Sequence, residues 1–107
     1  MTIKNLTPHA IHFIEDGSVV KTIEPEGILA RVSAVTVETG EVIDGIKVTA
    51  TSYGEVEGLP DPVDGTVYIV SALVAGRVPE RKDVFIPNES VRDDKGRIVG
   101  CRSLGRI

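Results

Sequence analysis

Thr66-Val67-Tyr68-Ile69-Val70-Ser71-Ala72-Leu73-Val74-Ala75 is the longest apolar stretch of this 107-residue chain. Residues 66–70 are β-branched or aromatic, which favours a strand buried on both faces. Ser71 is a good helix N-cap, residues 72–75 favour a helical turn, and Gly76 suits its early end. We therefore expect a central strand, a short helix and then a charged loop, the kind of place where small β-rich domains bind ligands.

Two-residue alternation predicts further strands on both sides of this stretch. Tight turns are expected at Asp16-Gly17, at Asp44-Gly45 and within 93–96. No helical period is sustained over 11 residues. The fold expected for residues 1–107 is therefore a single, mostly β domain (α+β with one short helix), a small antiparallel β-sandwich or half-open barrel of six to eight strands. The expected flanking strands are 10–14, 18–23, 28–38, 46–53, 83–86 and 98–102, with a loop over 54–65 and a stop at Pro87-Asn88.

Composition indicates an ordinary globular protein, with 41% hydrophobic and 26% charged residues. No apolar run approaches the roughly 18 residues needed to span a bilayer, and the N-terminus is no signal peptide. The single cysteine, Cys101, excludes an internal disulfide and indicates a cytoplasmic setting. Its apolar neighbours favour a buried, inert thiol over a nucleophile.

Charge is unevenly distributed along the chain. The net charge is −4, but the residues from Arg77 to Ile107 carry +3 and the rest −7. This balance disfavours DNA as a partner and allows a local anion site in the C-terminal third. Because small β domains often cover their edge strands by association, we expect a homo-oligomer, a dimer or larger.

Two constellations could carry acid–base chemistry. His9 follows Thr7-Pro8, which would aim its imidazole, although hydrogen bonding to nearby backbone explains it equally well. In a strand, His9 and His12 would point to opposite faces, so no metal site is expected. Glu55 and Glu57 share a strand face and could act with His9 as catalytic groups; the alternative is a solvated loop.

Three arginines near expected strand ends, Arg81, Arg92 and Arg102, could clamp a phosphate or carboxylate. The alternative is surface ion pairing with Asp83 and neighbouring acids. Phosphate-loop, nucleophile-elbow and CxxC motifs are absent, and no cofactor is expected.

Several blocks together resemble a group of short bacteriophage and prophage proteins, over nearly the whole chain. The blocks are Asn5-Leu6-Thr7-Pro8-His9-Ala10-Ile11, Tyr53-Gly54-Glu55-Val56-Glu57-Gly58-Leu59-Pro60, Tyr68-Ile69-Val70-Ser71, Arg81-Lys82-Asp83-Val84, Val91-Arg92-Asp93 and Gly100-Cys101-Arg102-Ser103-Leu104. The resemblance implies a phage origin. A small β-rich phage protein with a polar pocket and no catalytic signature is similar in kind to anti-defence sponges. These are oligomers that sequester nucleotide signals of bacterial immunity.

The leading hypothesis is therefore a non-enzymatic phage protein that acts in the host cytoplasm and sequesters a cyclic oligonucleotide or a cyclic ADP-ribose type signal. The alternatives are an enzyme that cleaves such a signal, through His9 with Glu55 or Glu57, and a structural or regulatory protein acting through a protein–protein interface. The expected ligand-binding residues are Asn5, Thr7, His9, Tyr53, Ser71, Arg81, Asp83, Arg92 and Arg102, of which the arginines would hold phosphates and His9, Tyr53 and Ser71 would contact base or ribose.

Overall fold

The computed structural model describes all residues from 1 to 107, and its centre is β6 (Thr66–Ile69). Tyr68, Ile69 and Val70 are almost completely buried, which confirms the expected buried strand. α1 (Ala72–Arg77) follows directly. The Ser71 hydroxyl caps it by accepting a hydrogen bond from the Val74 amide at 3.3 Å, as the sequence predicted.

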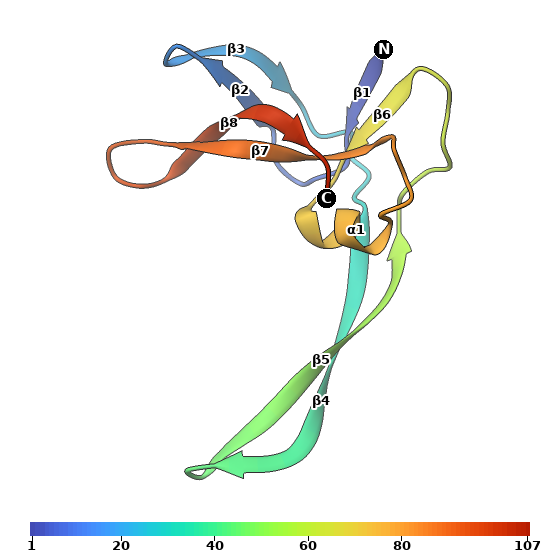
Figure 1. Ribbon diagram of the computed structural model, residues 1–107, viewed down its shortest axis with the longest axis vertical. Helices are drawn as coiled ribbons and strands as arrows, with labels where there is room; N and C mark the ends of the chain where they lie inside the picture. The colour runs from blue at the N-terminus through green and yellow to red at the C-terminus, as the bar shows by residue number, and fades with distance from the viewer.

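Six strands form one sheet in the order β1-β6-β7-β8-β2-β3, a nearly closed, barrel-like arrangement (Figure 1). The predicted fold class, mostly β with one short helix, is confirmed. The strands other than β6 are β1 (Thr2–Asn5), β2 (Ile11–Glu15), β3 (Ser18–Ile23), β7 (Val84–Arg92) and β8 (Ile98–Gly105).

The direction of pairing differs from the antiparallel expectation. β6 pairs in parallel with both β1 and β7, and β2 meets β8 in parallel at Phe13 and Cys101. Only β2 with β3 and β7 with β8 are antiparallel within this sheet, and both pairs are hairpins. Parallel neighbours need long connections, and α1 with its flanking loops supplies one between β6 and β7.

The core consists of two clusters on either side of β6. The larger one contains the helix and the inner side chains Leu6, Tyr68, Val70, Val74 and Val84, among others. The smaller one joins Ile11, Ile69 and Cys101, so the thiol is buried as expected. Burial raises the pKa of the Cys101 thiol, which keeps it protonated and unreactive.

β4 (Arg31–Ile43) and β5 (Ile46–Glu57) form a separate two-stranded hairpin that projects away from the six-stranded sheet (Figure 1). We call residues 31–57 the arm and the rest of the chain the head. The chain measures 51 × 39 × 23 Å, and its radius of gyration is 17.1 Å, against roughly 13 Å for a compact domain of this length.

Several strand boundaries depart from the sequence prediction. β4 begins at Arg31 and passes through Gly40, while β5 passes through Gly54, because bulges at both places absorb the glycines within the ladder. β7 continues through Pro87, because β6 pairs only as far as Phe85 and leaves one side of β7 without a neighbour. β1 was not predicted as a strand.

Candidate functional site

Asn5 and Thr7 hold the chain together at a bend. The Asn5 amide donates to the carbonyl oxygens of His9 at 2.8 Å and Ile23 at 3.0 Å. Its own oxygen accepts from the Thr7 amide at 3.0 Å and the Thr7 hydroxyl at 2.7 Å. Asn5 is fully buried, so these four bonds satisfy an amide that solvent does not reach. Its contacts are all internal to the protein.

Arg81 and Asp83 form a bidentate ion pair, with Nε–Oδ1 at 2.8 Å and Nη2–Oδ2 at 2.9 Å. Arg81 Nη2 also donates to the Pro60 carbonyl at 2.9 Å, which fastens the loop before β6. Hydrogen bonding to Arg81 lowers the pKa of Asp83, and the same bond raises the pKa of Arg81. The guanidinium is therefore engaged with groups of this chain, which corresponds to the ion-pairing alternative.

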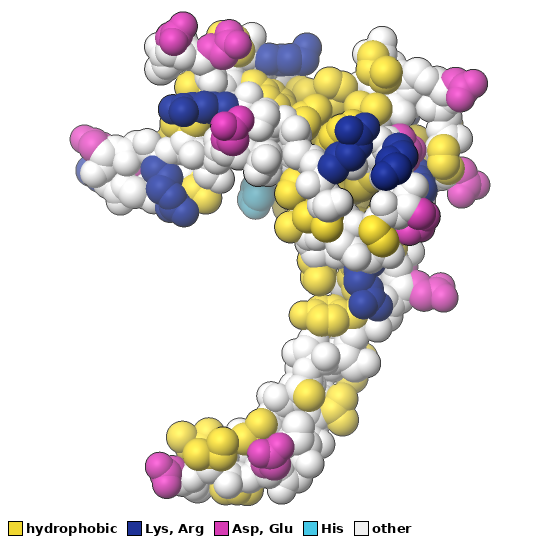
Figure 2. Space-filling model, in the orientation of Figure 1, with side chains coloured by type: hydrophobic (Ala, Val, Ile, Leu, Met, Phe, Trp, Pro, Cys, Tyr) yellow, Lys and Arg dark blue, Asp and Glu magenta, His cyan; other side chains and the backbone are white.

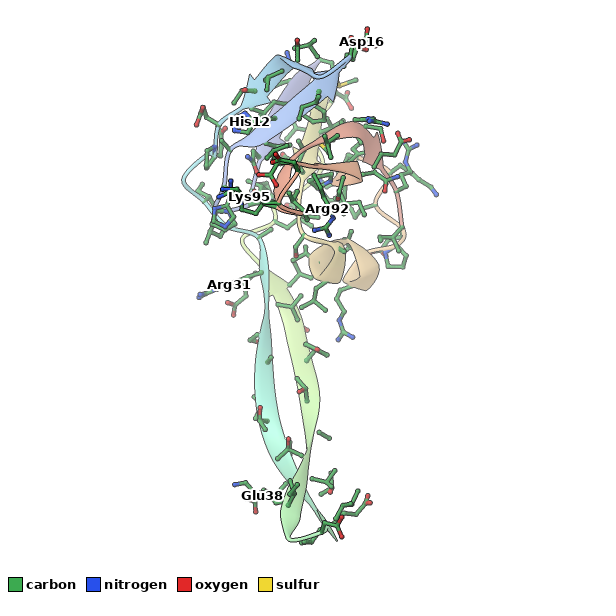
Figure 3. The ribbon with its side chains drawn as sticks, turned by 90° about the vertical axis from the view of Figure 1, so that its left-hand side faces the viewer. His12, Asp16, Arg31, Glu38, Arg92 and Lys95 are labelled. Atoms are coloured by element: carbon green, nitrogen blue, oxygen red, sulfur yellow. The ribbon has the colours of Figure 1, made fainter.

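The three arginines of the expected phosphate clamp have different surroundings. Arg92 donates to the Gly96 carbonyl at 2.6 Å and closes the β7–β8 turn. Arg102 is exposed on β8, and its side chain makes no hydrogen bond or ion pair within the chain. Figure 3 labels Arg92 within the outline of the head, with Lys95 of the same turn beside it. The structure thus leaves Arg102 as the arginine of this set that is free for an external anion.

Tyr53 and the two glutamates lie on β5 of the arm. The Arg77 guanidinium lies 5.9 Å from the centre of the Tyr53 ring. Glu57 pairs with Arg31 at 3.5 Å, both side chains being largely exposed, and Arg31 marks the start of the arm in Figure 3. Ser71, the last of the expected polar contacts, is the helix cap described above.

His9 and His12 line one groove between β2, β7 and β8, a cavity of about 320 Å³. Ala10 and Ile11 line it as well. β2 begins only at Ile11, so His9 lies outside the strand and the alternation expected within a strand does not apply to it. The His12 Nδ1 lies 2.9 Å from the Thr22 hydroxyl. No group of three or more His, Cys, Asp and Glu side chains is placed to hold a metal ion.

A second cavity opens at the seam where edge strands β1 and β3 come together, and we call it the seam cavity. Its volume is about 310 Å³, and it is open to solvent. Two cations, Lys21 and Arg102, stand at its edge. The complete lining is Ile3, Phe13, Lys21, Ile23, Arg102, Ser103 and Leu104.

The sheet topology explains how this lining assembles. β2 lies between β3 and β8, so Phe13 pairs with Lys21 on one side and Cys101 on the other. Ile3, Phe13, Ile23 and Leu104 pack against the smaller core cluster and form an apolar wall. The arrangement therefore combines an apolar wall, an aromatic ring, the Ser103 hydroxyl and two positive charges.

The electrostatics of the seam cavity favour an anion on its β8 side. The side chain of Lys21, like that of Arg102, takes part in no ion pair or hydrogen bond within the chain. No acidic residue lines the cavity. Glu24 and Glu26 line the adjoining hollow, which shares Ile3, Lys21 and Ile23 with it. An anionic group would therefore lie nearer Arg102, away from these carboxylates.

Sequence reasoning had selected Arg102 and missed Lys21, Phe13 and Ser103. The signal for Lys21 was a lone cation within an alternating strand, which by itself does not indicate a site. Comparisons with models of protein families, with curated proteins and with solved structures found no match. The one helix is far too short to cross a bilayer.

Proposed function

We propose that this chain binds a phosphate-bearing nucleotide in the seam cavity and sequesters it without cleaving it. Together with the resemblance to phage proteins, this makes it an anti-defence protein that acts in the bacterial cytoplasm. The ligand would be an immune signal of the cyclic oligonucleotide or cyclic ADP-ribose type. The observation that carries the proposal is the pair of cations, Lys21 and Arg102, without internal partners beside one apolar-walled cavity.

The lining suits the parts of a nucleotide. The Arg102 guanidinium can bind two phosphate oxygens at once, while Lys21 adds a second positive charge. The ring of Phe13 and the aliphatic wall offer a surface for a base, which is flat and weakly polar. The Ser103 hydroxyl can donate to a phosphate or ribose oxygen or accept from a ribose hydroxyl.

Sequestration requires only binding, and the structure provides groups for binding in one place. The residues of the enzymatic alternative belong to different parts of the molecule. His9 lines the groove with His12, whereas Glu57 forms an ion pair with Arg31 at the base of the arm. We therefore place the ligand in the seam cavity and assign no catalytic residue.

Isothermal titration tests the proposal with a panel of cyclic dinucleotides, cyclic trinucleotides and cyclic ADP-ribose isomers. Arg102→Ala and Lys21→Ala should each weaken binding about ten- to hundredfold, because a hydrogen bond to a charged group contributes about 1.5–3 kcal/mol. Lys95→Ala is the matched control: it removes one exposed positive charge from the β7–β8 turn, outside the cavity, and should leave affinity unchanged.

Two results would contradict the proposal. One is the absence of binding by the whole panel at tens of micromolar. The other is equal weakening by Lys95→Ala, which would indicate attraction by net charge alone. Mass analysis of ligand recovered after denaturation separates sequestration from cleavage: intact ligand is expected, and a cleaved product would favour the enzymatic alternative.

A further inference from the structure

The arm has one apolar face and one polar face. Side chains of directly paired residues lie on the same side of a two-stranded sheet, and neighbours along a strand alternate. The pairs Val37 with Ala50 and Ile43 with Ile46 therefore share one side. We call this side the apolar arm face; its apolar members are Val35, Val37, Ile43, Ile46, Val48 and Ala50, and Ser52 lies on the same side as the partner of Val35.

The opposite face is polar. It carries Thr36 paired with Thr51 and Glu38 paired with Thr49. Lys47, on the same face, forms an ion pair with Glu38 at 3.0 Å. Val42 is the only large aliphatic side chain between residues 35 and 52 on this side. The arm is thus patterned as a sheet that is packed on one face and solvated on the other.

Most of the apolar arm face is uncovered, and only Val48 among its large aliphatic members is partly buried. Val35, Ile43 and Ile46 are 62%, 61% and 69% exposed, and Val37 is 50% exposed. Figure 2 shows hydrophobic side chains gathered at the far end of the arm, well away from the head, and Figure 3 places Glu38 near that end. An isolated two-stranded hairpin is at best marginally stable in water, so this face needs a partner.

The exposed surface area indicates how much surface is available for contact with that partner. The chain exposes 7384 Å², whereas a compact folded protein of 11.4 kDa exposes about 5,800 Å². The excess of about 1,600 Å² for one chain is about twice the roughly 800 Å² that each partner contributes to a standard stable protein–protein interface. The extra surface therefore suffices for a stable association.

The distribution of charged residues on the arm indicates what kind of partner fits it. None of the paired residues of the apolar arm face is charged, and the charges of Glu38 and Lys47 lie on the other side; Glu41 lies in the bulge between Glu38 and Val42 and has no paired partner. Two identical faces of this kind can pack together without opposing like charges, as a two-fold symmetric interface requires. We propose that a second copy of this chain covers the apolar arm face with its own, the two arms packing face to face. This proposal does not depend on the ligand proposed above.

Light scattering coupled to size-exclusion chromatography, followed by sedimentation equilibrium, tests the interface. Wild type should associate, and Val37→Lys should weaken the association at least about 100-fold, because two symmetry-related charges would enter an apolar contact. Thr36→Lys is the matched control: it adds the same side chain at a neighbouring β-branched position on the polar face, and association should persist. Circular dichroism checks that each variant keeps the folded head.

Mixing variants tests the face-to-face arrangement. Val37→Glu alone should also dissociate, and an equimolar mixture with Val37→Lys should associate at least about tenfold more tightly than either variant alone, because opposite charges then meet. A monomeric wild type, an associated Val37→Lys variant, or disruption by Thr36→Lys would overturn the proposal. A mixture that stays dissociated would show that the apolar arm face docks on another surface of its partner.

Discussion

Replacing Asn5 by alanine removes the side chain that joins the two edges of the barrel-like sheet. Its amide donates to the His9 and Ile23 carbonyls, so it links the end of β1 to the end of β3. Its oxygen receives two hydrogen bonds from Thr7. Because Asn5 is fully buried, Asn5→Ala creates a space too small and enclosed to be solvated freely.

The expected loss of stability follows from those contacts. The Ile23 carbonyl and the Thr7 amide lose this partner, whereas the His9 carbonyl keeps a hydrogen bond from the Thr7 hydroxyl at 3.1 Å. Each unsatisfied group costs about 1–3 kcal/mol, and partial relaxation lowers the sum, so we expect a loss of about 2–4 kcal/mol. A domain of this size has only about 5–15 kcal/mol in total, so Asn5→Ala should be partly unfolded at modest urea concentrations.

Urea denaturation followed by circular dichroism measures the effect. Thr7→Val is the matched control, because it keeps the side-chain volume and the backbone amide and removes only the hydroxyl, at a cost of about 1 kcal/mol. The reasoning is refuted if Asn5→Ala loses less than about 1 kcal/mol, or no more than Thr7→Val. Either outcome would mean that water replaces the amide and that the seam is not held by Asn5.

Two further predictions concern the ion pair and a turn. Arg81 lowers the pKa of Asp83 in the folded state, so this pair contributes stability above about pH 4 and loses it as the pH falls through the lower, folded pKa. Acid unfolding of Asp83→Asn should therefore be less steep than that of wild type below pH 4, and parallel curves would contradict it. Gly58 has a φ of +81°, and a Cβ there would overlap the Leu29 carbonyl, whereas Gly27, at a φ of +93°, faces open space. In urea unfolding, Gly58→Ala should lose about 1–3 kcal/mol more than Gly27→Ala, and equal losses would show that the backbone gives way at Gly58.

Local physical chemistry was enough to predict the centre of the fold. The run from Thr66 to Val70 combines β-branching with complete apolarity, so it is stable only when both faces are covered. Ser71 ends the strand and caps the helix with one side chain, an interaction that depends on residues three apart. The Asp16-Gly17 and Asp44-Gly45 turns likewise need only two residues with positive φ, and both are present.

The parts that sequence reasoning missed depend on contacts between distant residues. β1 is only four residues long and includes Lys4 and Asn5, so its strand conformation comes from pairing with β6. The parallel pairing of β6 with β7 depends on where α1 directs the following chain. The alternation of apolar and polar residues along the sequence does not predict that direction. The sequence pattern predicts that a strand ends before Gly40 and before Gly54. In the structure β4 and β5 continue through these glycines, because bulges in the long hairpin accommodate them.

The polar motif residues show why a candidate site needs the fold as well as the sequence. We interpreted several polar residues as ligand contacts because they interrupt apolar sequence: Asn5, Thr7, Ser71 and the Arg81–Asp83 pair. In the structure each of them makes hydrogen bonds that stabilise a bend, a helix end or a loop. A group already engaged in this way binds a ligand only after giving up those bonds, at a cost of about 0.5–3 kcal/mol each. Arg102 and Lys21 have no such bonds to lose. They are distinguished by side chains without an internal partner and by a shared cavity, which the strand order brings about by placing β3 and β8 on either side of β2.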